Sequence, residues 1–308
     1  MPATIRRAED TLVCLDLANG AMLWKTALPG EPLGRRASAT PSVDGGKVFA
    51  VGSARVWCLD AASGKTLWET PLTSERGINA SPLVVDGAVI VNADALIAYE
   101  AATGLERWRR SEAGGTNSSP VAWTADGRTL VIVNGRNALS ALDPRTGEIV
   151  WTAPGGGPST PAILGDILAV QTKTDLGFVA YRLTAQGATK LWSRPNGAWR
   201  LRSSPLIHEG AVYLMDNYVH ECFDLATGAL RWHEPAASEI TSPILADGKI
   251  FVLTGMGSTL LAIKATAQER LVLGKATVRA QWVPSPCLID GRLILRMPNS
   301  IKCWSLLP

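Results

Sequence analysis

The stretch LDAASGKTLWET, residues 59–70, contains an aspartate, a glycine four residues later and a tryptophan four residues after that. The same acidic–glycine–tryptophan spacing recurs along the chain, and one copy, YRLTAQGATKLWSR, is longer by two residues. The further copies occupy residues 15–26, 99–110, 142–153, 181–194 and 223–234. Such self-similarity at a regular interval predicts a repeat architecture in which each copy is one structural unit.

A Ser/Thr-Pro pair marks the start of each unit. The prolines of these pairs, spaced 38 to 44 residues apart, are Pro41, Pro82, Pro120, Pro161, Pro205, Pro243 and Pro286. After each proline, short apolar segments alternate with turn residues such as VDGG and ADGK, and the last segment of most units carries the tryptophan. Four short strands per unit, without helical periodicity, predict an all-β fold.

A unit of about 40 residues with four antiparallel strands is typical of a β-propeller blade, as in WD40-like repeats. We expect the repeat tryptophan to dock between blades with its indole N–H bonded nearby, and the repeat glycine to provide a positive φ or room for that ring. The docking tryptophans are Trp24, Trp68, Trp108, Trp151, Trp192 and Trp232. The glycines are Gly20, Gly64, Gly104, Gly147, Gly187 and Gly228. The copy TAQERLVLGK, residues 266–275, has no tryptophan.

Seven Ser/Thr-Pro strands favour a propeller of seven four-stranded antiparallel blades. The last unit has only three strands, and the N-terminal segment 9–27 supplies a third strand and a tryptophan strand. We therefore expect residues 20–27 to lie beside the C-terminal strands, so that the N- and C-terminal strands close the ring. In a seven-bladed ring, one of the two candidate third strands, 11–17 or 300–306, is surplus. A propeller of eight blades, two of them incomplete, would use both of these strands.

The cysteines are expected to be packing residues. Four of the five stand at one repeat position in the third strand, where other copies have alanine, which indicates a small, buried side chain. The cysteines at this position are Cys14, Cys58, Cys222 and Cys303, and the alanines are Ala98, Ala141, Ala180 and Ala262. Cys287 stands apart, on an expected inner strand, and no CxxC pair suggests metal or redox chemistry.

The length of 308 residues suits one large domain or two ordinary ones, and the repeat favours a single propeller domain over residues 1–308. The chain has 46% hydrophobic residues and a net charge of +3. This mild charge gives no reason to expect nucleic-acid binding. No apolar run is long enough for a membrane span, and the N-terminal MPATIRRAEDTLVC lacks the apolar region of a signal peptide. We therefore expect a cytoplasmic protein, or a periplasmic one if an export signal was removed.

The sequence contains no catalytic or metal-binding motif that we can identify. His208, His220 and His233 are not spaced as zinc ligands, and the GGGP segment at 155–158 lacks the following helix of a phosphate site. We predict no catalytic residue and no metal ligand. An enzymatic activity is therefore uncertain, and the sequence favours a protein that is not an enzyme.

The repeat resembles the tryptophan-docking motif of the PQQ-like propeller family. The copies that carry it are CLDAASGKTLW (58–68), AYEAATGLERW (98–108), ALDPRTGEIVW (141–151) and CFDLATGALRW (222–232). The resemblance covers nearly the whole chain and implies the propeller fold. The family includes quinoprotein alcohol dehydrogenases, which bind pyrroloquinoline quinone (PQQ) and Ca²⁺, a periplasmic scaffold of outer-membrane assembly, and sensor domains of kinases. The adjacent cysteines that cover the quinone in the dehydrogenases are absent here.

The best candidate binding site is formed by the loops that precede the first strand of each blade, because these loops open onto one end of a propeller channel. We call them the rim loops: residues 34–41, 75–82, 114–120, 155–161, 199–205, 237–243 and 280–286. Their candidate ligand-binding residues are Arg35, Arg36, Arg76, Asn79, Asn117, Trp199, Arg200, Arg202, Arg279 and Trp282, opposed only by Glu75 and Glu239. Converging guanidiniums would suit a small anionic ligand or an acidic peptide, and the alternative is that these arginines are simply solvated.

The sequence favours a non-catalytic PQQ-like propeller that serves as a scaffold for a protein partner or a small anionic ligand. The alternative is a PQQ-binding sensor or a quinoprotein-type oxidoreductase, so PQQ is the one cofactor to consider. A scaffold for outer-membrane assembly would additionally require export.

Overall fold

The computed structural model describes residues 8–30, 39–52, 55–72, 74, 78–115, 117–195, 203–216, 219–236, 241–280 and 284–306. All regular elements in this part of the chain are strands. The chain divides into two compact units, the first made of Met1–Gly157 with Ala185–Gly187 and the second of Pro158–Thr184 with Ala188–Pro308. A single domain spanning the whole chain stays a prediction.

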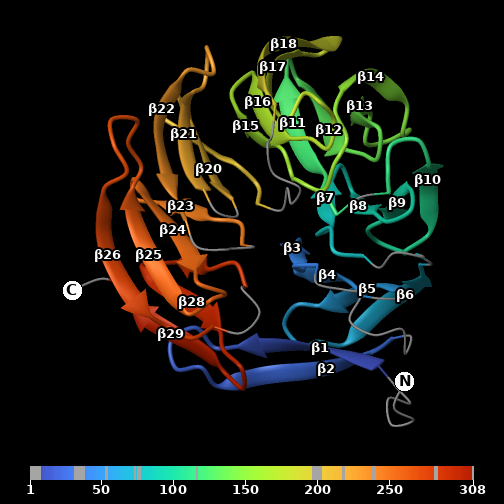
Figure 1. Ribbon diagram of the computed structural model, residues 1–308. Coiled ribbons are helices and arrows are strands. Elements are labelled where there is room, and N and C mark those ends of the chain that lie inside the picture. The colour runs from blue at the N-terminus through green and yellow to red at the C-terminus, as the bar shows by residue number, and fades with distance from the viewer. Residues whose placement is uncertain are drawn as a thin grey trace, which may run out of the picture. The chain divides into compact units, whose positions relative to one another are not determined.

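The first unit contains four antiparallel sheets, coloured blue to green in Figure 1. The N-terminal sheet has two strands, β1 (Ala8–Leu15) and β2 (Met22–Gly30). The second sheet consists of β3 (Ser42–Asp44), β4 (Lys47–Val51), β5 (Arg55–Asp60) and β6 (Thr66–Pro71). The third consists of β7 (Leu83–Val85), β8 (Ala88–Asn92), β9 (Leu96–Glu100) and β10 (Glu106–Arg110). The fourth consists of β11 (Val121–Ala125), β12 (Arg128–Asn134), β13 (Ala138–Leu142) and β14 (Ile149–Pro154).

The second unit also contains four sheets, coloured yellow-green to red in Figure 1. The first consists of β15 (Ala162–Leu164), β16 (Ile167–Gln171), β17 (Phe178–Thr184) and β18 (Gly187–Arg194). The next consists of β19 (Leu206–His208), β20 (Ala211–Asp216), β21 (Val219–Asp224) and β22 (Leu230–Pro235). It is followed by β23 (Ile244–Ala246), β24 (Lys249–Thr254), β25 (Thr259–Lys264) and β26 (Val272–Thr277). The C-terminal sheet has three strands, β27 (Cys287–Ile289), β28 (Arg292–Arg296) and β29 (Ile301–Ser305).

Every sheet is a meander in which strands adjacent in sequence are hydrogen-bonded neighbours. The predicted all-β class and the four-stranded antiparallel blade are confirmed. Seven sheets begin with a strand after a Ser/Thr-Pro pair, and in the described residues six of them have four strands while the seventh has three. Both candidate third strands at the ends of the chain are used, because β1 pairs with β2 and β29 pairs with β28. Closure of a ring by the terminal strands stays a prediction.

The acidic–glycine segment builds the turn between the third and fourth strands of a blade. In the second sheet, the Gly64 N–H donates to the Asp60 carbonyl at 2.8 Å, and the Asp60 carboxylate accepts the Ser63 N–H at 2.8 Å. Gly64 has a φ of 70°, a conformation that costs glycine little because it has no Cβ. The aspartate thus bonds to the backbone of its own turn while the glycine allows the chain to reverse.

The repeat tryptophan contacts this turn in the next sheet. The Trp68 indole N–H donates to the Ala101 carbonyl at 3.1 Å, and a Cβ added to Gly104 would lie 2.5 Å from the Trp68 ring. Glycine is therefore needed at this position for both its φ and its lack of a side chain. Equivalent indole bonds join Trp24 to Ala61 (3.0 Å), Trp108 to Pro144 (2.9 Å), Trp192 to Leu225 (2.8 Å) and Trp232 to Thr266 (2.9 Å).

The small third-strand residue lies directly opposite the tryptophan in the same sheet. The register pairs Cys14 with Trp24, Cys58 with Trp68, Ala98 with Trp108, Ala141 with Trp151 and Cys222 with Trp232. Cys58 and Cys222 are fully buried, as predicted, whereas Cys14 is half-buried. Cys303 is exposed, contrary to the prediction, because its sheet has no fourth strand in the described residues to cover it. All five cysteines are free, and Cys287 lies exposed on β27, the first strand of its sheet.

Two members of the repeat depart from this pattern. Gly187 is a strand residue without a positive φ, and a Cβ there would meet nothing within 4 Å. The reason is local, since the two extra residues of this copy replace the acidic–glycine turn by a two-residue turn, residues 185–186, between β17 and β18. Trp151 is buried, but its indole N–H has no hydrogen-bond partner among the described residues.

Apolar side chains fill the spaces between successive sheets within each unit. In the first unit, Phe49 and Val56 of the second sheet pack with Val91 and Ile97 of the third. In the second unit, the buried cluster between β19–β22 and β23–β26 contains Trp232. The docking tryptophans therefore lie within or beside the main apolar contacts between neighbouring sheets.

Replacing a docking glycine should be more destabilising than replacing a turn glycine that has a similar φ. Gly228 (φ 70°) has the Trp192 ring 2.5 Å from an added Cβ, whereas Gly210 (φ 74°) has nothing within 4 Å. We expect Gly210→Ala to cost about 1–2 kcal/mol from backbone strain and Gly228→Ala about 1–3 kcal/mol more from displacement of the ring. Urea unfolding of both variants measures the difference, and equal losses would contradict the docking role of Gly228.

The indole hydrogen bond should be separable from the packing of the ring. Trp108→Phe removes the N–H that bonds to Pro144, whereas Trp151→Phe removes an N–H that has no described partner. We expect the first substitution to cost about 1 kcal/mol more than the second, because only the first leaves a carbonyl without its donor. Denaturant midpoints and slopes of the two variants test this, and an equal or larger loss for Trp151→Phe would refute it.

Candidate functional site

The rim loops are tied to one another by hydrogen bonds between their Ser/Thr-Pro pairs. In the first unit, the Thr40 N–H donates to the Ser81 hydroxyl at 3.0 Å, and the Ser81 N–H donates to the Ser119 hydroxyl at 2.9 Å. In the second unit, the Thr160 N–H donates to Ser204 at 3.3 Å and the Ser204 N–H to Ser242 at 3.1 Å. The hydroxyls of Ser81, Ser119, Ser204 and Ser242 thus each accept a hydrogen bond from a backbone N–H of the preceding loop, which gives a reason for a hydroxyl residue before these prolines.

A buried polar residue at the end of the second strand anchors the next rim loop. Asn92 at the end of β8 donates to the Ser118 carbonyl at 2.8 Å and accepts the Gly115 N–H at 3.0 Å. Asn134 at the end of β12 accepts the Gly156 N–H at 2.8 Å, and Gln171 at the end of β16 donates to the Ser203 carbonyl at 3.2 Å. Asn92, Asn134 and Gln171 have no exposed surface, so these bonds form in a low dielectric.

Sequence reasoning did not identify these three anchoring residues. Their signal is a single polar residue at the end of an apolar strand, as in AVIVN and TLVIVN, at the same place in successive copies. Such a residue resembles the start of a turn, and only the fold shows that its amide reaches the following sheet. The described residues of three rim loops, 114–120, 155–161 and 199–205, are therefore held by hydrogen bonds to these side chains.

Three of the predicted site residues lie in the described part of the chain. Asn79 and Asn117 come together, since the Asn79 amide donates to the Asn117 side-chain oxygen at 3.2 Å. Arg279 is exposed after β26, with a φ of 55°, and its N–H donates to the Ser258 carbonyl at 3.2 Å. The other predicted residues lie outside the described residues: Arg35, Arg36, Arg76, Trp199, Arg200, Arg202 and Trp282. Their convergence stays a prediction.

The three histidines lie in different environments. His220 is fully buried on β21, and Arg270 Nε donates to its Nδ1 at 3.3 Å. Burial, with a further contribution from the charge of Arg270, lowers the His220 pKa to about 4, so the ring is neutral near pH 7. His233 contacts Glu221 at 2.9 Å near the surface, and His208 lies 3.9 Å from Glu209. In the described residues, no group of three or more His, Cys, Asp or Glu side chains could hold a metal ion.

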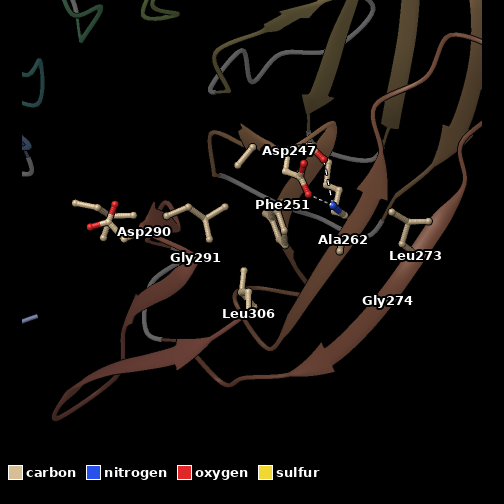
Figure 2. Close-up of a pocket in the computed structure, with 12 residues that line it drawn as sticks. Asp247, Phe251, Ala262, Leu273, Gly274, Asp290, Gly291 and Leu306 are labelled. Carbon is tan, nitrogen blue, oxygen red and sulfur yellow. Dashed lines mark hydrogen bonds and ion pairs between the residues drawn. The ribbon is translucent and has the colours of Figure 1, made fainter. Parts of the chain in front are cut away.

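The second unit also contains a cavity of about 600 Å³ between β23–β26 and the C-terminal sheet. Figure 2 shows Asp247, Phe251, Ala262, Leu273 and Leu306 among the residues that line it. Leu288 and Ile289 of β27 and the Asp290–Gly291 turn complete the wall on the C-terminal side. Its volume lies within the range of small-molecule and cofactor pockets, roughly 300–1,000 Å³. Sequence reasoning noted only that the copy at 266–275 lacks a tryptophan.

The sequence matches a family model described as outer membrane protein assembly factor BamB, in two overlapping segments, residues 8–122 and 93–299. These segments together span nearly the whole chain. The chain belongs to this family. The resemblance to PQQ-like propeller repeats is thereby confirmed. Among the described residues, no helix has the length and apolar character needed to span a membrane.

One BamB sequence and one BamB crystal structure illustrate this similarity. BamB of Salmonella typhimurium is 27% identical over 252 residues, which cover 77% of this chain and 63% of that protein. The chain therefore matches less than two thirds of the length of this relative. The crystal structure of BamB from Moraxella catarrhalis superposes with a TM-score of 0.77, at 17% identity, over 97% of this chain and 90% of that one, which supports the propeller fold.

The sequence similarity to a quinoprotein covers a smaller part of the chain. The quinohemoprotein alcohol dehydrogenase ADH IIB of Pseudomonas putida is 28% identical over 149 residues, which cover 44% of this chain and 21% of that enzyme. The similarity to this enzyme therefore extends over less than half of the chain, whereas the BamB family model extends over nearly all of it.

The buried histidine should make the stability of this BamB-family chain depend on pH. Because the folded pKa of His220 is about 4 and its ordinary value is 6.5, the unfolded chain binds more protons between these values. Stability should therefore fall as pH drops from 6.5 toward 4, by on the order of 3 kcal/mol in total. His220→Gln should remove this component.

Urea unfolding at several pH values between 7 and 4 provides the measurement. The stability of His220→Gln should depend less steeply on pH than that of the wild-type chain. An unchanged slope in His220→Gln would contradict the assignment to His220.

Proposed function

We propose that this chain is a non-catalytic, BamB-type propeller that holds a protein partner during the assembly of outer membrane proteins. This proposal rests on the match to the BamB family model over residues 8–299. Relatives under this description are named as assembly factors for outer membrane proteins. The chain matches only part of the length of those relatives, so its partner and its place in such an assembly are part of the proposal.

The rim loops are the proposed contact surface. Hydrogen bonds to Ser81, Ser119, Ser204 and Ser242 fix the described parts of these loops to their neighbours. A surface that is already ordered before binding loses less conformational entropy when a partner arrives. The arginines of the rim loops would give such a surface a positive potential, which suits an acidic segment of a partner.

The proposed function also changes the expected compartment. Outer membrane proteins are assembled from the periplasmic side, so we propose a periplasmic location in place of the cytoplasmic expectation from the N-terminal segment.

A PQQ-binding role is the second candidate, supported by the similarity to the quinohemoprotein alcohol dehydrogenase over 149 residues. A bound quinone, an anion, would also suit the rim arginines. The two candidates differ in what stabilises the protein, since a small ligand that binds only the folded state raises the melting temperature.

The rim loops can be tested by in-cell crosslinking of the full chain, exported to the periplasm, followed by identification of the crosslinked proteins. We expect capture of an outer membrane assembly component, reduced about tenfold by Arg200→Ala with Arg202→Ala. Arg145→Ala with Arg182→Ala is the matched control, because both side chains are exposed and lie outside the rim loops. If both double variants reduce capture equally, or if neither reduces it, the rim loops are not the contact surface.

A melt of the same proteins with PQQ, with and without Ca²⁺, tests the second candidate. If the partner-binding proposal is right, PQQ should not change the melting temperature. A rise of several degrees that Arg200→Ala with Arg202→Ala abolishes would favour the quinone-binding alternative.

A further inference from the structure

The sheet β23–β26 has no docking tryptophan at the repeat position. In five other sheets a small third-strand residue pairs with the tryptophan of the fourth strand, but in this sheet Ala262 pairs with Gly274. Gly274 has no positive φ, and a Cβ there would meet nothing within 4 Å. The backbone is therefore compatible with a side chain at this position, and the space beside it is open.

The aromatic partner of the missing indole is nevertheless present. In the filled positions, Phe49 lies beside Trp68 and Tyr213 beside Trp232, each with ring centroids 6.1 Å apart. Phe49 and Tyr213 both pair with the small third-strand residue of their sheets, and Phe251 pairs with Ala262 in the same way. Phe251 lines the cavity, so one wall of an indole site exists without the indole.

A carbonyl that could accept the N–H of an indole is also present, on the side of the cavity formed by the C-terminal sheet. In a filled site, the Ala101 carbonyl accepts the Trp68 indole N–H, and the Ala101 N–H donates to Gly87 at 2.9 Å. Leu306 occupies the equivalent place in the C-terminal sheet, since it follows Cys303 by three residues and its N–H donates to Gly291 at 2.7 Å. Figure 2 shows Leu306 and Gly274 on different sides of the cavity. The Leu306 carbonyl therefore stands where the other copies receive an indole N–H.

The surroundings of the cavity favour an apolar side chain with a basic neighbour. Leu273 of β26 is 49% exposed and Ile289 of β27 is 45% exposed, so apolar surface continues outside the cavity. The carboxylate of Asp247 is paired with Lys249, whereas Asp290 has no ion pair in the described residues. A cation beside the incoming side chain could therefore pair with Asp290 without competing with another group.

We infer that this cavity binds a tryptophan side chain presented by an extended, basic segment of a partner protein. The indole would lie beside Phe251, as Trp68 lies beside Phe49, and would donate its N–H to the Leu306 carbonyl. The occupant is inferred from the chain itself, because its own filled copies use this side chain in this setting. None of the residues that line the cavity belongs to a rim loop, and the inference does not depend on the function proposed for the rim loops.

A peptide copied from the chain's own docking strand provides the probe. The segment LERWRRS, residues 105–111, contains Trp108 flanked by arginines. As a capped, fluorescein-labelled peptide it should bind the full chain in an anisotropy titration, and replacing its tryptophan by alanine should weaken binding about tenfold or more. Equal binding of the two peptides would overturn the inference.

Filling the cavity from within the chain is the decisive control. Gly274→Trp should place an indole in the cavity, raise the melting temperature and weaken peptide binding about tenfold or more, whereas Gly274→Ala should leave binding unchanged. Asp290→Asn, which retains a residue suited to its φ of 47°, should weaken binding of the basic peptide in low salt even if Gly274→Trp does not fold.

Unchanged binding in both Gly274→Trp and Asp290→Asn would refute the site. If the wild-type chain forms a dimer and Gly274→Trp abolishes it, the occupant of the cavity is a second copy of the chain. That result would overturn the inference that a segment of a partner protein binds there. The double variant Arg200→Ala with Arg202→Ala should bind the peptide normally, which separates this result from that of the rim loops.

Discussion

The structure depends on one repeated contact, in which an indole from one sheet lies against a glycine of the next and donates its N–H to a nearby carbonyl. Each part of the sequence motif serves this contact. The acidic residue holds the turn through hydrogen bonds such as that from Ser63 to Asp60, and the glycine leaves room for the ring. The small residue opposite Trp68 is Cys58, and its side chain is fully buried. Propeller sheets have no helices to cover their faces, so neighbouring sheets must bury those faces by contacts of this kind.

The sequence was sufficient to predict the strands and the blades because two independent markers share one period. The Ser/Thr-Pro pair starts each sheet and the acidic–glycine–tryptophan segment ends most of them, so strand order follows from spacing alone. The prediction failed where a local change altered the turn, as at Gly187, where two additional residues produce a shorter turn. It also failed at Cys303, because burial at that position depends on a fourth strand that the described sheet lacks.

The candidate sites were less predictable for physical reasons. Asn92 and Asn134 anchor rim loops of the following sheet, and such contacts between repeats are not visible in the sequence of one repeat. The missing tryptophan at Gly274 is visible in the sequence, but a gap in a repeat could be filled by any neighbouring side chain. Only the positions of Phe251 and Leu306 show that both walls of the indole site remain. Of the predicted rim residues, Asn79 and Asn117 are in contact, and the arginines other than Arg279 lie outside the described residues.

These features separate the part of the chain that builds the fold from the parts available for binding. The docking tryptophans are committed to contacts between sheets, whereas the rim loops and the cavity beside Gly274 are not required for those contacts. Membership of the BamB family supports the proposal that the repeats form a support and that the exposed surfaces bind a partner.

The most direct test of the docking contact is hydrogen exchange at the indole N–H groups, followed by NMR with assignments from single substitutions. If the docking contact holds the sheets together, exchange should be slow for Trp24, Trp68, Trp108, Trp192 and Trp232, with protection comparable to that of the central strand amides. Fast exchange of these indoles while the amides of β8 and β9 stay protected would contradict it, because the sheets would then hold together without the contact.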